Sequence, residues 1–320
     1  MEGIAVMTVV IRGLSNIASA PKRAVVTIGN FDGVHIGHQA LLKKVVEKAR
    51  ELKTASLAII FEPQPFEFFA PGASAPRLTR WREKFCLLAE QGINAVLVIR
   101  FNQSFANLTA EQFVQTILKN ALQAKQIIVG DDFQFGRGRE GDFNYLKTAG
   151  QHLGISVENM PAIFFQDERV SSTRVRKALA DSNHTLVEQL LGRAYAMKGR
   201  VVYGDQRGRQ MGFPTANIYL HRAVTPVQGV YVVRMHGVTD KALPGVANVG
   251  TRPTMDGTRS LLEVHLFDFA QEIYGRHVTV EFCEKLREEK RYPNLDLLIE
   301  QIEKDAKAAR HYFEKRGELP

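Results

Sequence analysis

The 320-residue sequence has little cysteine, no long apolar run and no dense block of charges of one sign. Its two cysteines, Cys86 and Cys283, are too few for a disulfide framework and form no CxxC pair, which favours a reducing compartment. No segment approaches the roughly 18 consecutive apolar residues of a transmembrane helix. The N-terminal stretch carries an acid where a signal peptide carries basic residues. We therefore expect a cytoplasmic protein with neither a membrane span nor an export signal.

The chain also lacks a clustered basic arm and a Walker loop, and each absence disfavours one class of function. Basic residues exceed acidic ones, 42 against 34, and this excess suits anionic small ligands as well as nucleic acid. The basic residues are scattered, which disfavours a dedicated nucleic-acid-binding arm, so we expect no nucleic-acid partner. The pattern G-x-x-x-x-G-K-S/T is also missing, and any phosphoryl transfer is therefore not performed by a Walker loop.

The length predicts two domains, which we place at residues 1–185 and 186–320. In the first, the strand-like runs AVVTIG, SLAIIF, AVLVIRF and QIIVG alternate with amphipathic helical stretches at residues 81–91 and 110–122. This alternation predicts an α/β domain with a parallel sheet that is covered on both faces. Ligands of such sheets bind beyond the carboxyl ends of the strands.

The second half changes in character after about residue 195. Its runs GRVVYG, TANIYL, GVYVVRM, GVANVG, LLEVHLFDF and HVTVEF are short, are bounded by glycine or proline, and in several cases alternate apolar with polar residues. They predict a small antiparallel barrel or sandwich. A long amphipathic helix over residues 295–316 follows them.

The segment GNFDGVHIGH, residues 29–38, lies between a predicted strand and a predicted helix. The start of a helix offers free backbone N–H groups and the positive end of its dipole, which suits a phosphate. His35 and His38 are three residues apart, so they can share one face of the first turn and donate hydrogen bonds to phosphate oxygens. Gly29 and Gly37 would let the backbone approach a ligand closely.

Two other segments of the first half resemble phosphate-binding motifs. VSSTRVRKAL, residues 170–179, is a helix start rich in hydroxyl groups, which predicts either a simple N-cap or a second phosphate site completed by Arg176. GRGREG, residues 136–141, satisfies G-x-G-x-x-G, but DDFQF separates it from the preceding strand. We interpret it as a mobile basic loop rather than a dinucleotide site.

In the second half, GRQMGFPTAN, residues 208–217, is the most informative segment. A turn into an edge strand accounts for its glycine and proline, but not for Thr215 and Asn217. These two side chains would lie on one side of an extended chain, and their neutral oxygens suit Mg²⁺ carried in by ATP. Glu263 interrupts an apolar series and therefore faces the other side of its strand, as a solvated residue or as a general base for a hydroxyl group.

Taken together, these residues resemble the family of prokaryotic bifunctional riboflavin kinase/FMN adenylyltransferases, also called FAD synthetases. The resemblance extends over nearly the whole chain. In the first half it rests on GNFDGVHIGH, FEPQP, VGDDFQFG and SSTRVR, and in the second on GRQMGFPTAN, GVANVGTRPT and LEVHLFDF. It implies a Rossmann-like nucleotidyltransferase module of the HIGH superfamily, followed by a six-stranded antiparallel riboflavin kinase barrel with a long terminal helix.

The same resemblance implies the chemistry. ATP phosphorylates riboflavin to FMN, and a second ATP adenylylates FMN to FAD with release of pyrophosphate; Mg²⁺ is the implied cofactor. The implied catalytic residues are Glu263, His35 and His38, the metal ligands are Thr215 and Asn217, and the flavin-binding residues are Asp132 and Phe133. The implied ATP and phosphate ligands are Gly29, Asn30, Phe31, Asp32, Gly37, Ser171, Ser172, Thr173, Arg176, Gly208, Arg209 and Gly212.

The sequence departs from the family at Gln64, where the usual EPHP reads EPQP. Glutamine cannot carry the charge of an imidazolium, so we expect a shifted or reduced pH dependence of adenylylation. Three alternatives stay open. In the first, only one of the two modules is active. In the second, the chain is another HIGH-class nucleotidyltransferase or ligase, although a KMSKS-like loop is missing. In the third, it is a flavin- or RNA-binding protein without turnover.

Overall fold

The computed structural model describes residues 7–72, 75–204, 208, 211–222, 224–254 and 257–319. The chain forms two compact units. The first comprises Met1–Ala75 and Thr79–Ser172, and the second comprises Pro76–Leu78 and Thr173–Pro320. Among the described residues, no helix has both the length and the apolar character needed to cross a lipid bilayer.

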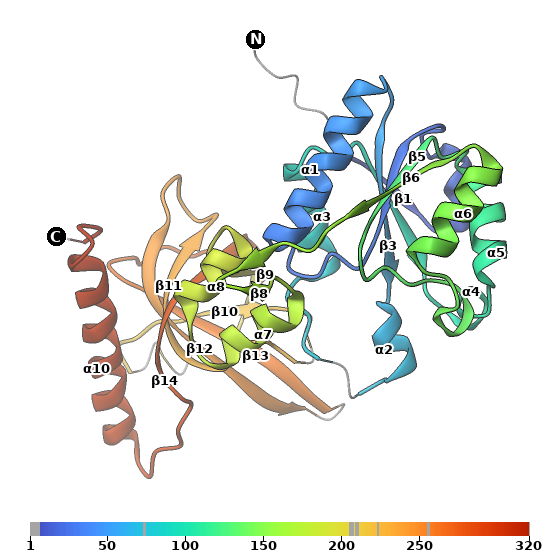
Figure 1. Cartoon of the computed structure of the whole chain (residues 1–320). Coiled ribbons are helices and arrows are strands. Elements are labelled where there is room, and N and C mark those ends of the chain that lie inside the picture. Colours follow the sequence, from blue (N-terminus) through green and yellow to red (C-terminus); the bar gives the residue numbers. More distant parts are fainter. Residues whose placement is uncertain are drawn as a thin grey trace. The chain divides into compact units, whose positions relative to one another are not determined.

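The first unit is built on a six-stranded sheet whose strands are all parallel, in the order β1-β4-β3-β2-β5-β6 (Figure 1). The strands are β1 (Val9–Arg12), β2 (Val25–Ile28), β3 (Ser56–Glu62), β4 (Ala95–Arg100), β5 (Gln126–Gly130) and β6 (Ser156–Met160). The helices are α1 (Ile36–Glu51), α2 (Pro65–Phe69), α3 (Trp81–Glu90), α4 (Gln103–Ala106), α5 (Ala110–Gln112) with its π-helical continuation η2 (Phe113–Ala121), and α6 (Phe143–Leu153). Two short 3₁₀ turns, η1 (Leu14–Ser19) and η3 (Arg137–Arg139), and a two-stranded ribbon of β7 (Phe164–Phe165) and β8 (Glu168–Arg169) complete it.

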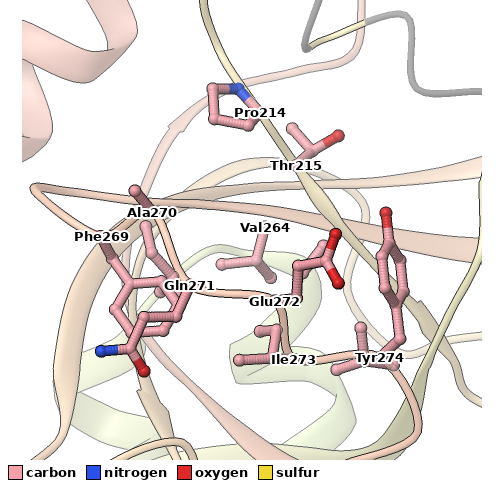
Figure 2. Close-up of a pocket in the computed structure, with 12 residues that line it drawn as sticks. Pro214, Thr215, Val264, Phe269, Ala270, Gln271, Glu272, Ile273 and Tyr274 are labelled. Atoms are coloured by element: carbon pink, nitrogen blue, oxygen red, sulfur yellow. The ribbon is translucent and has the colours of Figure 1, made fainter.

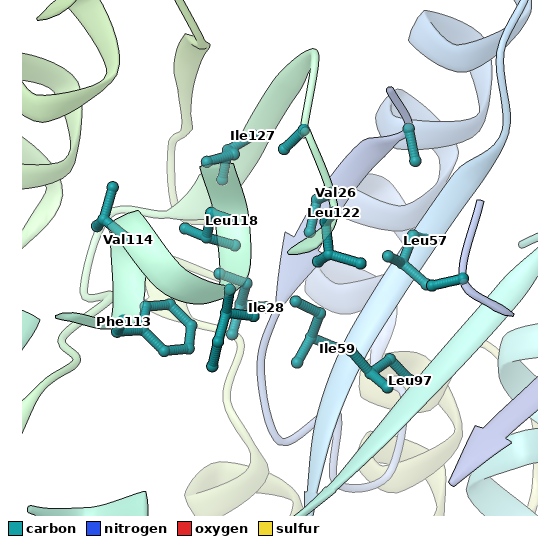
Figure 3. Close-up of a cluster of buried hydrophobic side chains, with 14 of the residues drawn as sticks. Val26, Ile28, Leu57, Ile59, Leu97, Phe113, Val114, Leu118, Leu122 and Ile127 are labelled. Carbon is teal, nitrogen blue, oxygen red and sulfur yellow. The ribbon is translucent and has the colours of Figure 1, made fainter. Parts of the chain in front are cut away.

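Alternate side chains of these strands are buried on opposite faces of the sheet. Val26, Ile28, Leu57 and Ile59 belong to a cluster that includes η2 residues such as Leu118 (Figure 3). The alternate strand residues Val25, Ala58 and Ile60 belong to a second cluster on the other face of the sheet. This cluster includes Leu42 and Val45 of α1 and Leu88 of α3. The prediction of a parallel sheet covered on both faces is confirmed. The edge strands β1 and β6 were not predicted.

The second unit contains helix α7 (Ser172–Ala180), apart from its first residue, and helix α8 (His184–Leu191). It continues as a closed barrel in the strand order β10-β13-β12-β11-β14-β9. Its strands are β9 (Tyr195–Val202), β10 (Ala216–Tyr219), β11 (Gly229–His236), β12 (Leu243–Thr254), β13 (Gly257–Leu266) and β14 (His277–Arg287). All pair antiparallel, and the pairing of β9 with β10 closes the sheet on itself, so the second half is a barrel and not a sandwich.

The long terminal helix α10 (Leu295–Glu314) packs on the outside of this barrel (Figure 1). Its Ala309 and Phe313 are buried against Val230, Val232 and Val246. The helix begins at Asn294, whose side chain accepts a hydrogen bond from the backbone N–H of Leu297 at 2.9 Å, an ordinary N-cap. One face of β11 and β12 is therefore covered by a helix and not by solvent.

Candidate active sites

The turn between β2 and α1 is held in an unusual backbone conformation. Phe31, Gly33 and Val34 have positive φ angles of 48°, 80° and 42°. A positive φ suits glycine, but at a β-branched residue such as Val34 it costs roughly 1–3 kcal/mol. The surrounding structure must therefore stabilise the turn.

Asp32 provides much of that stabilisation. Its Oδ1 accepts hydrogen bonds from the backbone N–H and the hydroxyl of Thr79, at 3.0 and 3.1 Å. The Thr79 hydroxyl oxygen in turn accepts from the N–H of Gly33 at 2.9 Å. Asp32 is 3% and Thr79 4% exposed, so these bonds are shielded from water. Asp32 shapes the turn, and its contribution to ATP binding stays a prediction.

His35 and His38 lie together on the first turn of α1, as their spacing predicted. Their rings stack with centroids 3.6 Å apart and planes 16° apart. His35 is the N-cap, and its Nδ1 accepts a hydrogen bond from the backbone N–H of His38 at 3.3 Å. A side chain at Gly37 would press on this ring, since its Cβ would lie 3.2 Å from His35 Nδ1. The glycine thus makes room for the imidazole.

The two rings differ in their surroundings. Because Nδ1 of His35 accepts a hydrogen bond, the neutral ring carries its proton on Nε2 and can donate from there. Phe31 packs edge-on against His38, with centroids 5.2 Å apart. Burial, with smaller effects from the nearby His35 and Lys84, holds the pKa of His38 well below its usual value. His38 is therefore neutral at physiological pH, and its Nδ1 is buried without a partner among the described residues.

The serine-rich segment meets the same turn. The hydroxyl of Ser172 donates to the backbone carbonyl of Asp32 at 2.9 Å, so Ser171 and Ser172 lie in the first unit beside the turn. Thr173 and Arg176 belong to the second unit, where Arg176 Nε donates to the carbonyl of Pro76 at 2.7 Å. That these side chains hold one nucleotide together stays a prediction.

The predicted flavin residues follow β5, at the carboxyl edge of the sheet. Asp132 forms an ion pair with Arg169 at 3.0 Å, and Asp131 pairs with the same guanidinium at 2.7 Å. The rings of Phe133 and Phe135 stack at 5.3 Å. This places an aromatic surface and two carboxylates at the end of the strand next to β2.

The sequence singled out two further segments of the first unit. The loop GRGREG is closed by paired backbone hydrogen bonds between Phe135 and Gly141, both at 2.9 Å, and Glu140 accepts from the N–H of Ala110. The bond from Ala110 links the loop to α5, and the mobility of the loop stays a prediction. Gln64 is fully buried, and neither polar atom of its amide has a partner within the described part of the chain.

In the second unit, a cavity of about 430 Å³ lies between α10 and the strands β10, β13 and β12. Thr215, Asn217 and Glu263 all line it. Asn217 is directly opposite Glu263 in the strand register. Leu262, Val264 and Leu266 are buried on the other face of β13, which confirms the predicted direction of Glu263. The rest of the lining includes Phe213, Val246, Asn248, Arg287, Glu289, Tyr292, Leu298 and Ile302.

A second cavity, of about 260 Å³, lies beside the first. Figure 2 shows Pro214 and Thr215 facing a loop that contains Phe269, Ile273 and Tyr274. Val201, Val264 and Leu266 add apolar surface. Among the described residues, only Thr215 lines both cavities, so it marks the point where they meet.

Close backbone packing positions the Thr-x-Asn pair. A Cβ at Gly204 would displace the amide of Asn217. One at Gly208 would collide with the backbone carbonyl of Phe213, so glycine is needed at residue 208. The ring N–H of His265 donates to the carbonyl of Pro214 at 2.9 Å, which fixes the start of β10. Gly212 has a φ of 83°, and Arg209 lies outside the described residues.

Among the described residues, no group of three or more His, Cys, Asp or Glu side chains could hold a metal ion. Thr215 and Asn217 supply neutral oxygens from one side of β10, a set that suits a hard divalent cation already bound to phosphates. Sequence reasoning missed Thr79, Asn248, Glu289 and the loop with Phe269 and Tyr274. Each is distant in sequence from the motif it meets, and only strand register and packing bring them together.

Comparison with known proteins accounts for both units. A model of FAD synthetase matches residues 17–174, and a model of riboflavin kinase matches residues 191–313. The chain is 50% identical over 304 residues to the bifunctional riboflavin kinase/FMN adenylyltransferase of Escherichia coli K12, covering 95% of this chain and 97% of that protein. It is 45% identical to the protein of the same name from Haemophilus influenzae, over 95% and 98% of the two chains.

A solved structure described as a macrolide-efflux protein from Streptococcus pneumoniae has the same fold, with a TM-score of 0.80 and 32% identity over 95% of this chain and 98% of that one. That description applies to the pneumococcal protein alone. The two family models and the near-complete coverage agree with one another. The chain belongs to the family of bifunctional riboflavin kinase/FMN adenylyltransferases.

Proposed function

We propose that the second unit phosphorylates riboflavin to FMN and that the first unit adenylylates FMN to FAD, each with its own ATP. Both activities follow from the family. We assign the adenylyltransferase to residues 1–185 and the kinase to residues 186–320, an assignment supported by the order of the two matching models. The observation that carries the kinase mechanism is that Thr215 lines two cavities of different character.

The two cavities suit the two substrates of the kinase. The larger contains the carboxylate of Glu263 and is roomy enough for a flavin ring system. The smaller is lined by Phe269, Ile273 and Tyr274 and suits an adenine ring. With riboflavin in the first and ATP in the second, the γ-phosphate and the 5′-hydroxyl would meet at Thr215.

Glu263 then acts as the general base. It accepts the proton of the 5′-hydroxyl while that oxygen attacks the γ-phosphorus, and ADP leaves with the electrons of the broken P–O bond. Thr215 and Asn217 would hold the divalent cation, which we propose is Mg²⁺ and which neutralises phosphate charge when bound. Gly208, Arg209 and Gly212 would complete the phosphate site from the preceding loop.

The adenylyl transfer needs no comparable base, because the attacking phosphate of FMN is already anionic. We propose that His35 and His38, as neutral donors, stabilise the charge that develops on the α-phosphate, together with the N–H groups at the start of α1. Gly29, Asn30, Phe31, Asp32 and Gly37 shape this site, and Ser171, Ser172, Thr173 and Arg176 add donors. Asp132 and Phe133 would contact the flavin.

The substrates and product proposed are riboflavin, FMN, FAD and ATP. The phosphates of FMN, FAD and ATP are anionic ligands that suit the basic excess of the chain, and we propose no nucleic-acid partner. We propose a cytoplasmic location, which the low cysteine content favours.

The test is to incubate the purified protein with riboflavin, ATP and Mg²⁺ and to separate the flavins by chromatography over time. FMN should rise first and then give way to FAD, and chelation of the metal should stop both steps.

Two variants separate the reactions. Glu263→Gln should lower FMN formation by about 10²- to 10⁴-fold, and His38→Ala should lower FAD formation from supplied FMN by about 10²- to 10³-fold. FMN without FAD would leave only the kinase active. Binding of flavin without any product would refute the enzymatic assignment.

A further inference from the structure

Three polar side chains stand in one row across the kinase barrel. Asn217 on β10 is opposite Glu263 on β13, and Glu263 is opposite Asn248 on β12. Residues directly opposite in an antiparallel pair project to the same face, and all three line the larger cavity. Glu263 is therefore flanked by one amide on each side, at the spacing of neighbouring strands.

The amide of Asn248 is oriented by a second carboxylate. Its Nδ2 donates to Oε1 of Glu289 at 3.4 Å, a long hydrogen bond to a group that can only accept. The other polar atom of the Asn248 amide is the acceptor Oδ1. This oxygen is buried and has no hydrogen-bond partner in the part of the chain that the structure describes.

Glu289 is itself seated closely against β12. A Cβ at Gly250 would collide with Oε1 of Glu289, so the carboxylate occupies the space that a side chain at Gly250 would need. The carboxylate thus lies along β12 beside Asn248, and both line the cavity. The contact of Glu289 with the Gly250 backbone limits its freedom and makes it a defined partner for the amide.

A buried acceptor without a donor destabilises the free protein, and a ligand that donates a hydrogen bond removes that cost. Glu263, the neighbour of Asn248, is the group that we assign to the reacting hydroxyl. A ligand group next to that hydroxyl, on the side away from Asn217, would lie at Asn248. In riboflavin this position carries the next hydroxyl of the ribityl chain, which is an O–H donor.

We propose that Asn248 recognises the secondary hydroxyl next to the one that is phosphorylated, and that Glu289 positions its amide for this contact. Asn248 is then a specificity-determining residue for a polyol chain with adjacent hydroxyl groups. Asn217 faces the phosphates and Asn248 faces the acceptor chain, one on each side of the base. The inference rests on the kinase function proposed above.

The experiment compares riboflavin with an analogue in which this secondary hydroxyl is replaced by hydrogen. We expect Asn248→Ala to lower kcat/KM of phosphorylation for riboflavin by about 10- to 100-fold, because it removes a buried hydrogen bond. The deoxy analogue should lose less than about threefold, since it never makes that bond. Asn248→Ser keeps a short oxygen acceptor and should recover part of the preference for riboflavin. Glu289→Ala should weaken the preference in the same direction.

Each other outcome contradicts the proposal. Equal losses with both flavins would mean that Asn248 supports only the fold, and an unchanged kcat/KM for riboflavin would mean that Oδ1 touches no substrate group. If the alanine variant does not fold, Glu289→Ala and Asn248→Ser test the proposal, because both should lower the preference for riboflavin over the deoxy analogue, Asn248→Ser by less than about tenfold. A wild-type protein that phosphorylates neither flavin would overturn the kinase function itself, a result that is distinct from a loss of discrimination by an active enzyme.

Discussion

The amide of Gln64 is fully buried at the end of β3 and has no partner for either polar atom within the described residues. The motif that this segment resembles has histidine there, a titrating group that glutamine lacks. We expect Gln64→His to make FAD formation from FMN fall on the acid side of its pH profile, because charging a buried imidazole is unfavourable. The measurement is kcat/KM from about pH 5.5 to 8. Gln64→Met is the control without a titrating group, and superimposable profiles for wild type and Gln64→His would refute the idea.

His38 gives a prediction about stability. Its pKa in the folded protein lies well below the usual histidine value of 6.5, chiefly because the ring is buried, so the unfolded chain binds more protons at acid pH. The stability that neutral His38 contributes is present above pH 6.5 and is lost as the pH falls towards the folded pKa. The free energy of unfolding should therefore fall more steeply below this pH in the wild type than in His38→Gln, by up to about 1.4 kcal/mol per pH unit.

Denaturant unfolding of both proteins at several pH values between about 7 and 5 measures this difference. Only the unfolding transition of the first unit should differ between the wild type and His38→Gln, since His38 lies in that unit. Parallel pH dependences for the two proteins would show that His38 does not titrate with a lowered pKa.

Among the elements, helix α10 is joined to the barrel by an ion pair between Arg287 and the buried Asp305. Arg287 at the end of β14 binds Asp305 through Nε and Nη2, at 2.7 to 3.0 Å, and the carboxylate also accepts from Gln301. Asp305 is 6% exposed, so removing Arg287 leaves a buried charge. We expect Arg287→Met to lower the free energy of unfolding of the second unit by about 3 kcal/mol. It should also raise KM for riboflavin, since both residues line the larger cavity.

The control for this prediction is on the same helix. Lys304 and Glu300 form an exposed pair, so Lys304→Ala should leave both the unfolding midpoint and KM nearly unchanged. The double variant Arg287→Met, Asp305→Leu removes both charges and should recover much of the lost stability. If Arg287→Met is no less stable than Lys304→Ala, the ion pair does not hold the helix.

The elements themselves were largely predictable, for physical reasons that differ between them. The strands of the barrel were found because their alternation or short apolar runs are bounded by glycine and proline, and the turn at residues 29–38 because strand and helix periods meet there. The edge strand Val9–Arg12 was missed because it is short, half-exposed and without alternation. The Asp32–Thr79 bonds join residues 47 apart, and Asn248 meets Glu263 only through register; no local pattern encodes either contact.

At the scale of the whole molecule, the two reactions use different units and share no proposed catalytic residue. FMN is the product of one and the substrate of the other, and its phosphate needs no activation by Glu263. Effects of variants in the two units should therefore be independent within about twofold. Glu263→Gln should still make FAD from supplied FMN, and His38→Ala should still make FMN from riboflavin.

Mixing the two variants should consequently restore FAD synthesis from riboflavin, because FMN released by His38→Ala is the substrate that Glu263→Gln can adenylylate. Chromatography of the flavins over time measures this, with each variant alone as the control. FMN should accumulate first and FAD should follow after a lag that shortens as the concentration of Glu263→Gln rises. If the mixture makes no more FAD than the separate variants, while each keeps its own half-reaction, FMN must be passed on without release, and the two units do not act as independent enzymes.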